Sequence, residues 1–161
     1  MDVKIIVDEN SLTKGNDDVI FGKIYISVGD SSFPDKKWDD FIVVIMSWWN
    51  EELLKIMDNN EMDNNEKDYQ LNFMDGPYEV VINRKPFERL ELECLRRGRD
   101  KNVVLSRVSC SLNEFSNQLI KATETVIKVL ESNNWDTNDI RILKDSYKNI
   151  QDKREGIPHS E

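Results

Sequence analysis

The chain has 161 residues, of which 39% are hydrophobic and four are tryptophans, so it has the length of one domain. Its 31 acidic and 22 basic side chains give a net charge of −9, which opposes binding to nucleic acid or anionic membranes and favours a basic partner or simple solubility. The one histidine, His159, lies near the end of the chain, which argues against histidine-based catalysis, Ser-His-Asp triads and histidine-ligated metals.

The first part of the chain predicts two β-strands. Residues 3–7, VKIIV, form a short β-branched run that ends at a polar stretch. Residues 19–28, VIFGKIYISV, place their isoleucines on one face, which is the period-two pattern of a half-buried strand. An exposed edge at residues 3–7 is a place where a partner strand or a second copy can pair, so a homodimer is one alternative.

The start of the chain and its cysteine content predict a cytoplasmic protein. The first residues, MDVKIIVDEN, are acidic where a secretory signal is positive, and no apolar run reaches the roughly 18 residues of a membrane span. Two cysteines, Cys94 and Cys110, are too few for a disulfide framework. We expect both thiols to lie in the core, too far apart in the last hairpin to form a disulfide bond.

Apolar residues that recur at three- and four-residue steps predict a helix over residues 38–57. Asp39 and Asp40 suit its first turn, where acidic side chains counter the macrodipole. The adjacent Trp48 and Trp49 point about 100° apart on a helix, so one enters the core while the other lies at its margin. We expect Trp49 to be an exposed anchor for a partner; burial of both tryptophans is the alternative.

The helix is followed by a polar duplication, in which MDNNE at residues 57–61 is repeated at residues 62–66. So short a polar repeat buries nothing, which predicts a solvated loop or a frayed helix end. Its spacing does not fit an EF-hand, because Met62 falls where an oxygen ligand belongs and no glycine supplies the turn. We expect four acidic side chains of this segment to contact a partner: Asp58, Glu61, Asp63 and Glu66.

Four strand-like runs follow with short links, which predicts consecutive antiparallel strands. The runs are YQLNF at residues 69–73, YEVVI at 78–82, LELEC at 90–94 and NVVLSRVSC at 102–110. Glu91 and Glu93 point outward from the third run, and we add them to the expected partner-binding surface. The basic turn RRGRDK at residues 96–101 is interpreted as an ordinary solvated turn, which the net charge favours over a phosphate site.

Asp75, Gly76 and Pro77 separate the first two of these runs, and turn chemistry explains all three residues. Asp and Gly tolerate left-handed geometry, and a proline has no N–H to give to a ladder. The alternative is a histidine-free hydrolase that acts through Asp75 with Glu79 or Glu91, and it requires a pocket around the turn. We therefore expect no catalytic residue, no metal and no cofactor.

The chain ends in two predicted helices. Ser111 and Glu114 form a capping box before the first helix, and Asp136 with Asp139 offers a cap for the second. The expected fold is α+β, a single antiparallel sheet with helices packed on it in the order β-β-α-β-β-β-β-α-α. We expect one domain over residues 1–152 and a polar, disordered tail over residues 153–161.

Two segments carry a resemblance. FPDKKWDDFIVVIMSWW followed by NFMDGPYEVVI resembles a group of small bacterial proteins that pair F-P-x-x-x-W-x-D-F-x-x-x-x-x-x-W-W with F-M-D-G-P-Y. These proteins are uncharacterised or of the immunity type encoded beside polymorphic toxins, including contact-dependent growth-inhibition systems. The match covers residues 33–82 and implies a cytoplasmic protein that neutralises a cognate toxin domain. It implies no catalytic residues.

Our leading hypothesis is therefore an immunity protein that binds a basic toxin domain, such as a nuclease, through an acidic surface. Charge complementarity increases the association rate and the specificity of such a complex. A regulatory or structural adaptor whose partner is not a toxin is the alternative, and the histidine-free hydrolase is the third.

Overall fold

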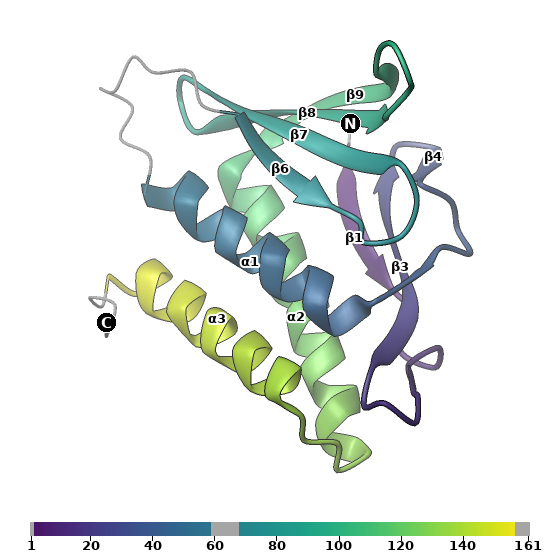
Figure 1. The fold of residues 1–161 in the computed structure, drawn as a ribbon. Coiled ribbons are helices and arrows are strands. Elements are labelled where there is room, and N and C mark those ends of the chain that lie inside the picture. The colour runs from purple at the N-terminus through teal and green to yellow at the C-terminus, as the bar shows by residue number, and fades with distance from the viewer. Residues whose placement is uncertain (1, 59–67, 157–161) are drawn as a thin grey trace.

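The computed structural model describes residues 2–58 and 68–156 of the chain (Figure 1). In this part of the chain, three helices accompany two antiparallel sheets, one of five strands and one of four. The predicted α+β class is confirmed, whereas the prediction of a single sheet is wrong. None of the helices in the described ranges has the length and apolar character needed to cross a membrane.

The first sheet is built around one long strand. The central β3 (Ile20–Val28) pairs with β1 (Val3–Val7) and with three short strands: β2 (Thr13–Lys14), β4 (Ser31–Phe33) and β5 (Asp39–Asp40). All pairs are antiparallel, and alternate residues of β3 are buried, as the period-two pattern predicts.

The second sheet is a meander of consecutive strands, as the sequence predicts. It contains β6 (Asp68–Asn72), β7 (Tyr78–Lys85), β8 (Arg89–Arg96) and β9 (Val103–Ser111) in that order. A register shift between Cys94 and Leu95 places Cys94 opposite Ser106, whereas regular continuation of the Leu95–Val104 pairing would place it opposite Leu105. Both cysteines are buried and free.

Helix α1 (Ile42–Asp58) begins later than predicted. Asp39 and Asp40 lie in β5, opposite Lys23 and Gly22 of β3, so the expectation that they occupy the first helical turn is wrong. Strand pairing with β3 outweighs the local helical pattern at these positions.

The last two helices are α2 (Leu112–Ser132) and α3 (Asn138–Arg154). Ser111 caps α2 as predicted, because its Oγ accepts a hydrogen bond from the Glu114 N–H at 3.0 Å. Thr137, and not Asp136, caps α3, and Asp136 is engaged by the Arg141 guanidinium. The predicted tail starts too early, since α3 includes Lys153 and Arg154; residues 157–161 lie outside the described ranges.

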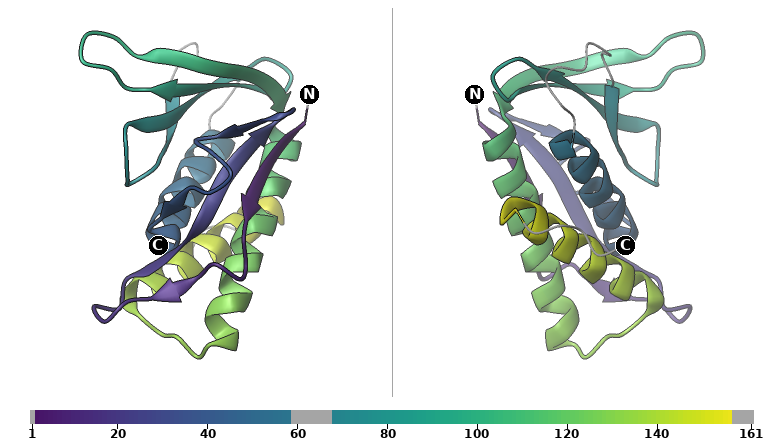
Figure 2. Two further views of the ribbon diagram at one scale, coloured as in Figure 1. Left: turned by 90° about the vertical axis from the view of Figure 1, so that its right-hand side faces the viewer. Right: turned by 90° about the vertical axis from the view of Figure 1, so that its left-hand side faces the viewer.

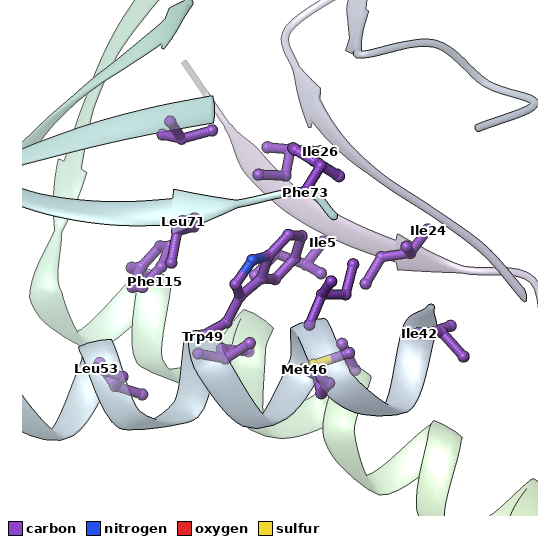
Figure 3. Packing of buried hydrophobic residues seen from close by; sticks show 14 of the residues in the cluster. Ile5, Ile24, Ile26, Ile42, Met46, Trp49, Leu53, Leu71, Phe73 and Phe115 are labelled. Carbon is purple, nitrogen blue, oxygen red and sulfur yellow. The ribbon is translucent and has the colours of Figure 1, made fainter. Parts of the chain in front are cut away.

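One hydrophobic cluster includes residues from both sheets and all three helices. Figure 3 shows Trp49 and Met46 of α1 facing Ile5 and Ile24 of the first sheet and Leu71 of the second. In Figure 1 the second sheet lies across the top of the view and the helices lie beneath it, so its upper face is left without a helix.

Candidate functional site

The two segments that carry the resemblance meet in space. Trp38 packs edge-to-face against Phe73 and Tyr78, with ring centroids 6.1 and 5.3 Å apart. Phe33 contacts the same two rings at 5.8 and 5.6 Å, and Trp49 contacts Phe73 at 5.2 Å. Such edge-to-face pairs are favourable beyond their burial. The motif residues therefore form one aromatic cluster that joins the first sheet, α1 and the β6–β7 connection.

Asp40 ties this cluster together through its carboxylate, which is only 1% exposed. Its Oδ2 accepts hydrogen bonds from Trp38 Nε1 at 3.0 Å and from the Asp75 N–H at 3.3 Å. Its Oδ1 accepts a hydrogen bond from the Phe41 N–H at 2.7 Å. A buried carboxylate is tolerated when donors surround it in this way. Asp40 thus holds the β6–β7 connection against the strand that precedes α1.

The Asp75-Gly76-Pro77 segment connects β6 to β7, and its geometry is built around Gly76. This residue has φ of +75°, and a Cβ placed on it would lie 2.7 Å from Trp38 Cη2. Only glycine meets both conditions without strain. Asp75 contributes its backbone N–H to Asp40, while its own side chain is exposed.

Helix α1 covers the free edge of β6. Trp49 Nε1 donates a hydrogen bond to the Asn72 carbonyl at 2.9 Å, and Glu52 accepts one from the Gln70 N–H at 3.2 Å. The structure therefore explains why the second sheet ends at β6 instead of joining the first: side chains of α1 occupy the groups that another strand would use.

This arrangement corrects the expectation for the two tryptophans. Trp49 is 0% exposed, so its side chain is not available to a partner, and Trp48 is the exposed one at 38%. Helical spacing places Trp48 one turn before Glu52 on the same stripe, beside the covered edge of β6. The sequence carries a signal for this choice: Leu53 and Ile56 follow Trp49 at i+4 and i+7, whereas the charged Glu52 and Lys55 follow Trp48.

The other residues expected to bind a partner are scattered. Asp58 is exposed and forms an ion pair with Lys153 of α3. Glu91 and Glu93 lie half-buried on the upper face of the second sheet, where Glu93 pairs with Arg107 at 2.9 Å. Glu61, Asp63 and Glu66 lie outside the described residues.

Acidic and basic side chains are concentrated in different parts of the chain, so the residues expected to bind a partner fall into an acidic segment and a basic segment. Residues 41–77 contain eight acidic and two basic side chains, a net charge of −6. Residues 78–111 contain five acidic and eight basic side chains, a net charge of +3. Glu91 and Glu93 therefore belong to the basic part of an acidic molecule. The acids of residues 41–77 that the structure describes lie on α1, β6 and the β6–β7 connection: Glu51, Glu52, Asp58, Asp68 and Asp75.

We call the exposed side of this acidic part the α1–β6 face. Its members are Trp48, Glu51, Glu52, Lys55, Asp68, Met74 and Asp75, and Lys55 forms an ion pair with Glu52 at 3.1 Å. The hydrogen bond between Glu52 and Gln70 fixes the two elements side by side. Trp48 and Met74 are 38% and 39% exposed, so the face combines apolar side chains with carboxylates.

Phe87 is a further exposed apolar side chain, which lies outside the α1–β6 face. It occupies the β7–β8 turn with φ of +61° and is 91% exposed, the most exposed large apolar side chain of the described residues. Arg84 Nη1 donates a hydrogen bond to the Ile56 carbonyl, which holds this end of β7 against the last turn of α1. The sequence signal for Phe87 is a lone aromatic residue within the turn-forming stretch NRKPFE.

The thiols of Cys94 and Cys110 lie outside the α1–β6 face and are not activated as nucleophiles. Burial raises the pKa of Cys94, and burial with a smaller contribution from Glu114 raises the pKa of Cys110 to about 11. Both thiols are therefore protonated at neutral pH, which makes them poor nucleophiles. Within residues 2–58 and 68–156 no three or more metal-binding side chains gather into a candidate metal site.

Comparison with protein-family models, with curated proteins and with solved structures finds no match to this chain. Its function is therefore inferred from its own residues.

Proposed function

We propose that this protein is an immunity-type inhibitor that binds the basic toxin domain of a cognate bacterial toxin through its α1–β6 face. It acts by occupying a surface of the toxin and not by chemical transformation. The observation that carries the proposal is the excess of acidic side chains, five against one basic among the described residues of 41–77, on the elements that surround an exposed tryptophan.

Electrostatics and burial have different roles in this complex. The acidic field attracts a basic partner over a Debye length of about 8 Å at physiological salt and raises the association rate. Once the surfaces touch, Trp48 and Met74 supply apolar area that the free protein leaves in water. Tryptophan side chains are enriched among the residues that dominate binding energy.

The cluster behind the face supports this role by keeping it rigid. Asp40 and Trp49 hold the C-terminal end of β6 and the connection that follows it through hydrogen bonds of 3.3 Å to Asp75 and 2.9 Å to Asn72. A surface that is ordered before binding loses less conformational entropy on association. The motif residues therefore have two roles: Asp40 and Trp49 shape the face from behind, whereas Trp48, Met74 and Asp75 lie on it.

We also place the protein in the cytoplasm, where an inhibitor meets a toxin that has entered the cell. Two free, buried thiols fit a reducing compartment.

The test is a binding measurement with the product of the adjacent toxin-like gene. We expect the wild-type protein to bind it at micromolar concentration or below, and Trp48→Ala to weaken binding at least about tenfold, or 1.4 kcal/mol. The matched control is Ile142→Ala on α3, because Ile142 is a large apolar side chain with a similar exposure of 43%. Equal effects of the two substitutions, or no binding at micromolar concentration, would overturn the proposal.

A further inference from the structure

Two of the long sheet edges in this protein are covered. The free edge of β6 is occupied by Trp49 and Glu52 of α1. The free edge of β1 is met by α2, where Gln118 Oε1 accepts a hydrogen bond from the Ile5 N–H at 3.3 Å. Proteins commonly protect sheet edges, because unpaired N–H and C=O groups recruit other strands.

The outer edge of β9 is different. It ends the second sheet and is paired only with β8. No hydrogen bond from another described element covers its outer side, and Figure 2 shows the β8–β9 hairpin reaching beyond the helices. Its first three residues, Val103, Val104 and Leu105, are apolar and 37, 40 and 49% exposed.

The direction of the free amides follows from one hydrogen bond at the end of the hairpin. The Leu112 N–H donates to the Glu88 carbonyl at 2.8 Å, so Leu112 points its N–H toward β8. Backbone N–H groups alternate in direction along a strand, and therefore Arg107 and Ser109 point theirs outward. These two N–H groups can therefore donate hydrogen bonds to a strand that is added beside β9.

The charge around β9 indicates what kind of strand fits. Residues 78–111 carry a net charge of +3. Arg96, Arg99 and Lys101 lie with Asp100 at the turn that leads into β9, and Arg97 of the same turn is engaged by Glu79 and by the Gly76 carbonyl. A second copy of this chain paired through β9 would bring two such regions together. An acidic strand would meet opposite charge on the same edge.

We propose that the β9 edge binds an extended segment of another protein in which acidic and apolar side chains alternate, as an added strand of the second sheet. The backbone of that segment pairs with β9, and its apolar residues contact Val104 and Leu105. This surface is distinct from the α1–β6 face and opposite to it in charge, so the two sites are independent.

The probe is a fluorescent peptide of the same length as β9 that alternates valine with glutamate. Binding followed by anisotropy should be at least about tenfold weaker for Ser109→Pro, because proline removes an outward amide. The matched variant Ser109→Ala keeps that amide and should bind like wild type. A peptide that alternates valine with lysine should bind at least about tenfold more weakly than the glutamate peptide.

A second variant separates charge from strand pairing. Arg99→Glu with Lys101→Glu should weaken the glutamate peptide and strengthen the lysine peptide, while β9 stays intact. Should Ser109→Pro lose its thermal unfolding transition, Leu105→Asp tests the same edge, because Leu105 is exposed and its replacement leaves the core unchanged. Equal binding of both peptides, unchanged binding by the edge variants, or self-association that Ser109→Pro abolishes would each overturn the proposal.

Discussion

The Asp40 carboxylate accepts three hydrogen bonds. The donors are the Trp38 indole, the N–H of Phe41 just before α1 and the N–H of Asp75 in the β6–β7 connection. Asparagine at this position keeps the shape but presents an NH₂ group to at least one of these donors. We expect Asp40→Asn to lower the free energy of unfolding by about 2–3 kcal/mol, the cost of losing charge-assisted bonds at a buried site. Urea denaturation measures this change.

Asp39 provides the control for that substitution, because it is adjacent and exposed. Asp39→Asn should change the free energy of unfolding by no more than about 0.5 kcal/mol. A similar loss for both variants would mean that the hydrogen bonds of Asp40 contribute nothing specific.

Gly76 allows a second test at single-residue scale, because Gly156 shares its conformation but not its surroundings. The two glycines have φ of +75° and +76°, but an added Cβ meets Trp38 at 2.7 Å at the first position and open space at the second. Gly156→Ala should cost about 1 kcal/mol of backbone strain, and Gly76→Ala clearly more because Trp38 must also move. Equal losses in urea denaturation would show that Trp38 does not restrict this turn.

The buried thiols predict a loss of stability at alkaline pH. The pKa of Cys110 rises from 9.0 to about 11 on folding, so the folded state retains a proton that the unfolded state releases. This contribution to stability is fully present below pH 9 and is lost as pH rises toward 11. We expect Cys110→Ala to unfold with a shallower pH dependence than wild type in this window, measured by denaturation at a series of pH values. An unchanged slope would contradict the prediction.

At the scale of elements, the contact of α1 with β6 decides how the sheets are divided. Trp49→Phe removes the hydrogen bond to Asn72 and part of the buried volume, and should lower the free energy of unfolding by about 2–3 kcal/mol. Trp48→Phe, at the exposed neighbour, should cost no more than about 0.5 kcal/mol. Thermal or urea unfolding of the two variants gives the comparison, and equal costs would contradict the burial pattern.

The elements also show what local sequence predicts and what it does not. The β6–β9 meander and the Ser111 cap depend on alternation and turn residues a few positions apart, and the sequence predicts both. The division into two sheets depends on α1 reaching the edge of β6, which is a tertiary contact. The local pattern predicts a helical turn at Asp40, but Asp40 pairs with Gly22 of β3, which lies 18 positions away in the sequence.

The same distinction applies to the candidate site. Charge segregation and the exposed Phe87 leave signals in the sequence, a run of acids and an aromatic residue in a turn. The choice between Trp48 and Trp49 leaves one too, because Trp49 shares its stripe with Leu53 and Ile56, whereas Trp48 shares its stripe with charged residues; the hydrogen bond of Trp49 to Asn72 is a tertiary contact that local sequence does not show.

At the scale of the molecule, opposite charge on two surfaces predicts opposite responses to salt and to mutation. Binding through the α1–β6 face should weaken when Glu51, which is exposed, is replaced by lysine, and the association rate should fall as salt rises. Stopped-flow association measures both effects. Arg99→Glu, in the basic hairpin, should leave the association rate unchanged or raise it. A decrease in this rate would indicate that the toxin does not bind through the α1–β6 face.

The most direct measurement is the affinity of the wild-type protein and Trp48→Ala for the toxin domain encoded next to it, by isothermal titration calorimetry. The account predicts a complex of micromolar or tighter affinity that Trp48→Ala weakens at least about tenfold while Ile142→Ala leaves it intact. A complex that tolerates Trp48→Ala, or the absence of any complex, would contradict it.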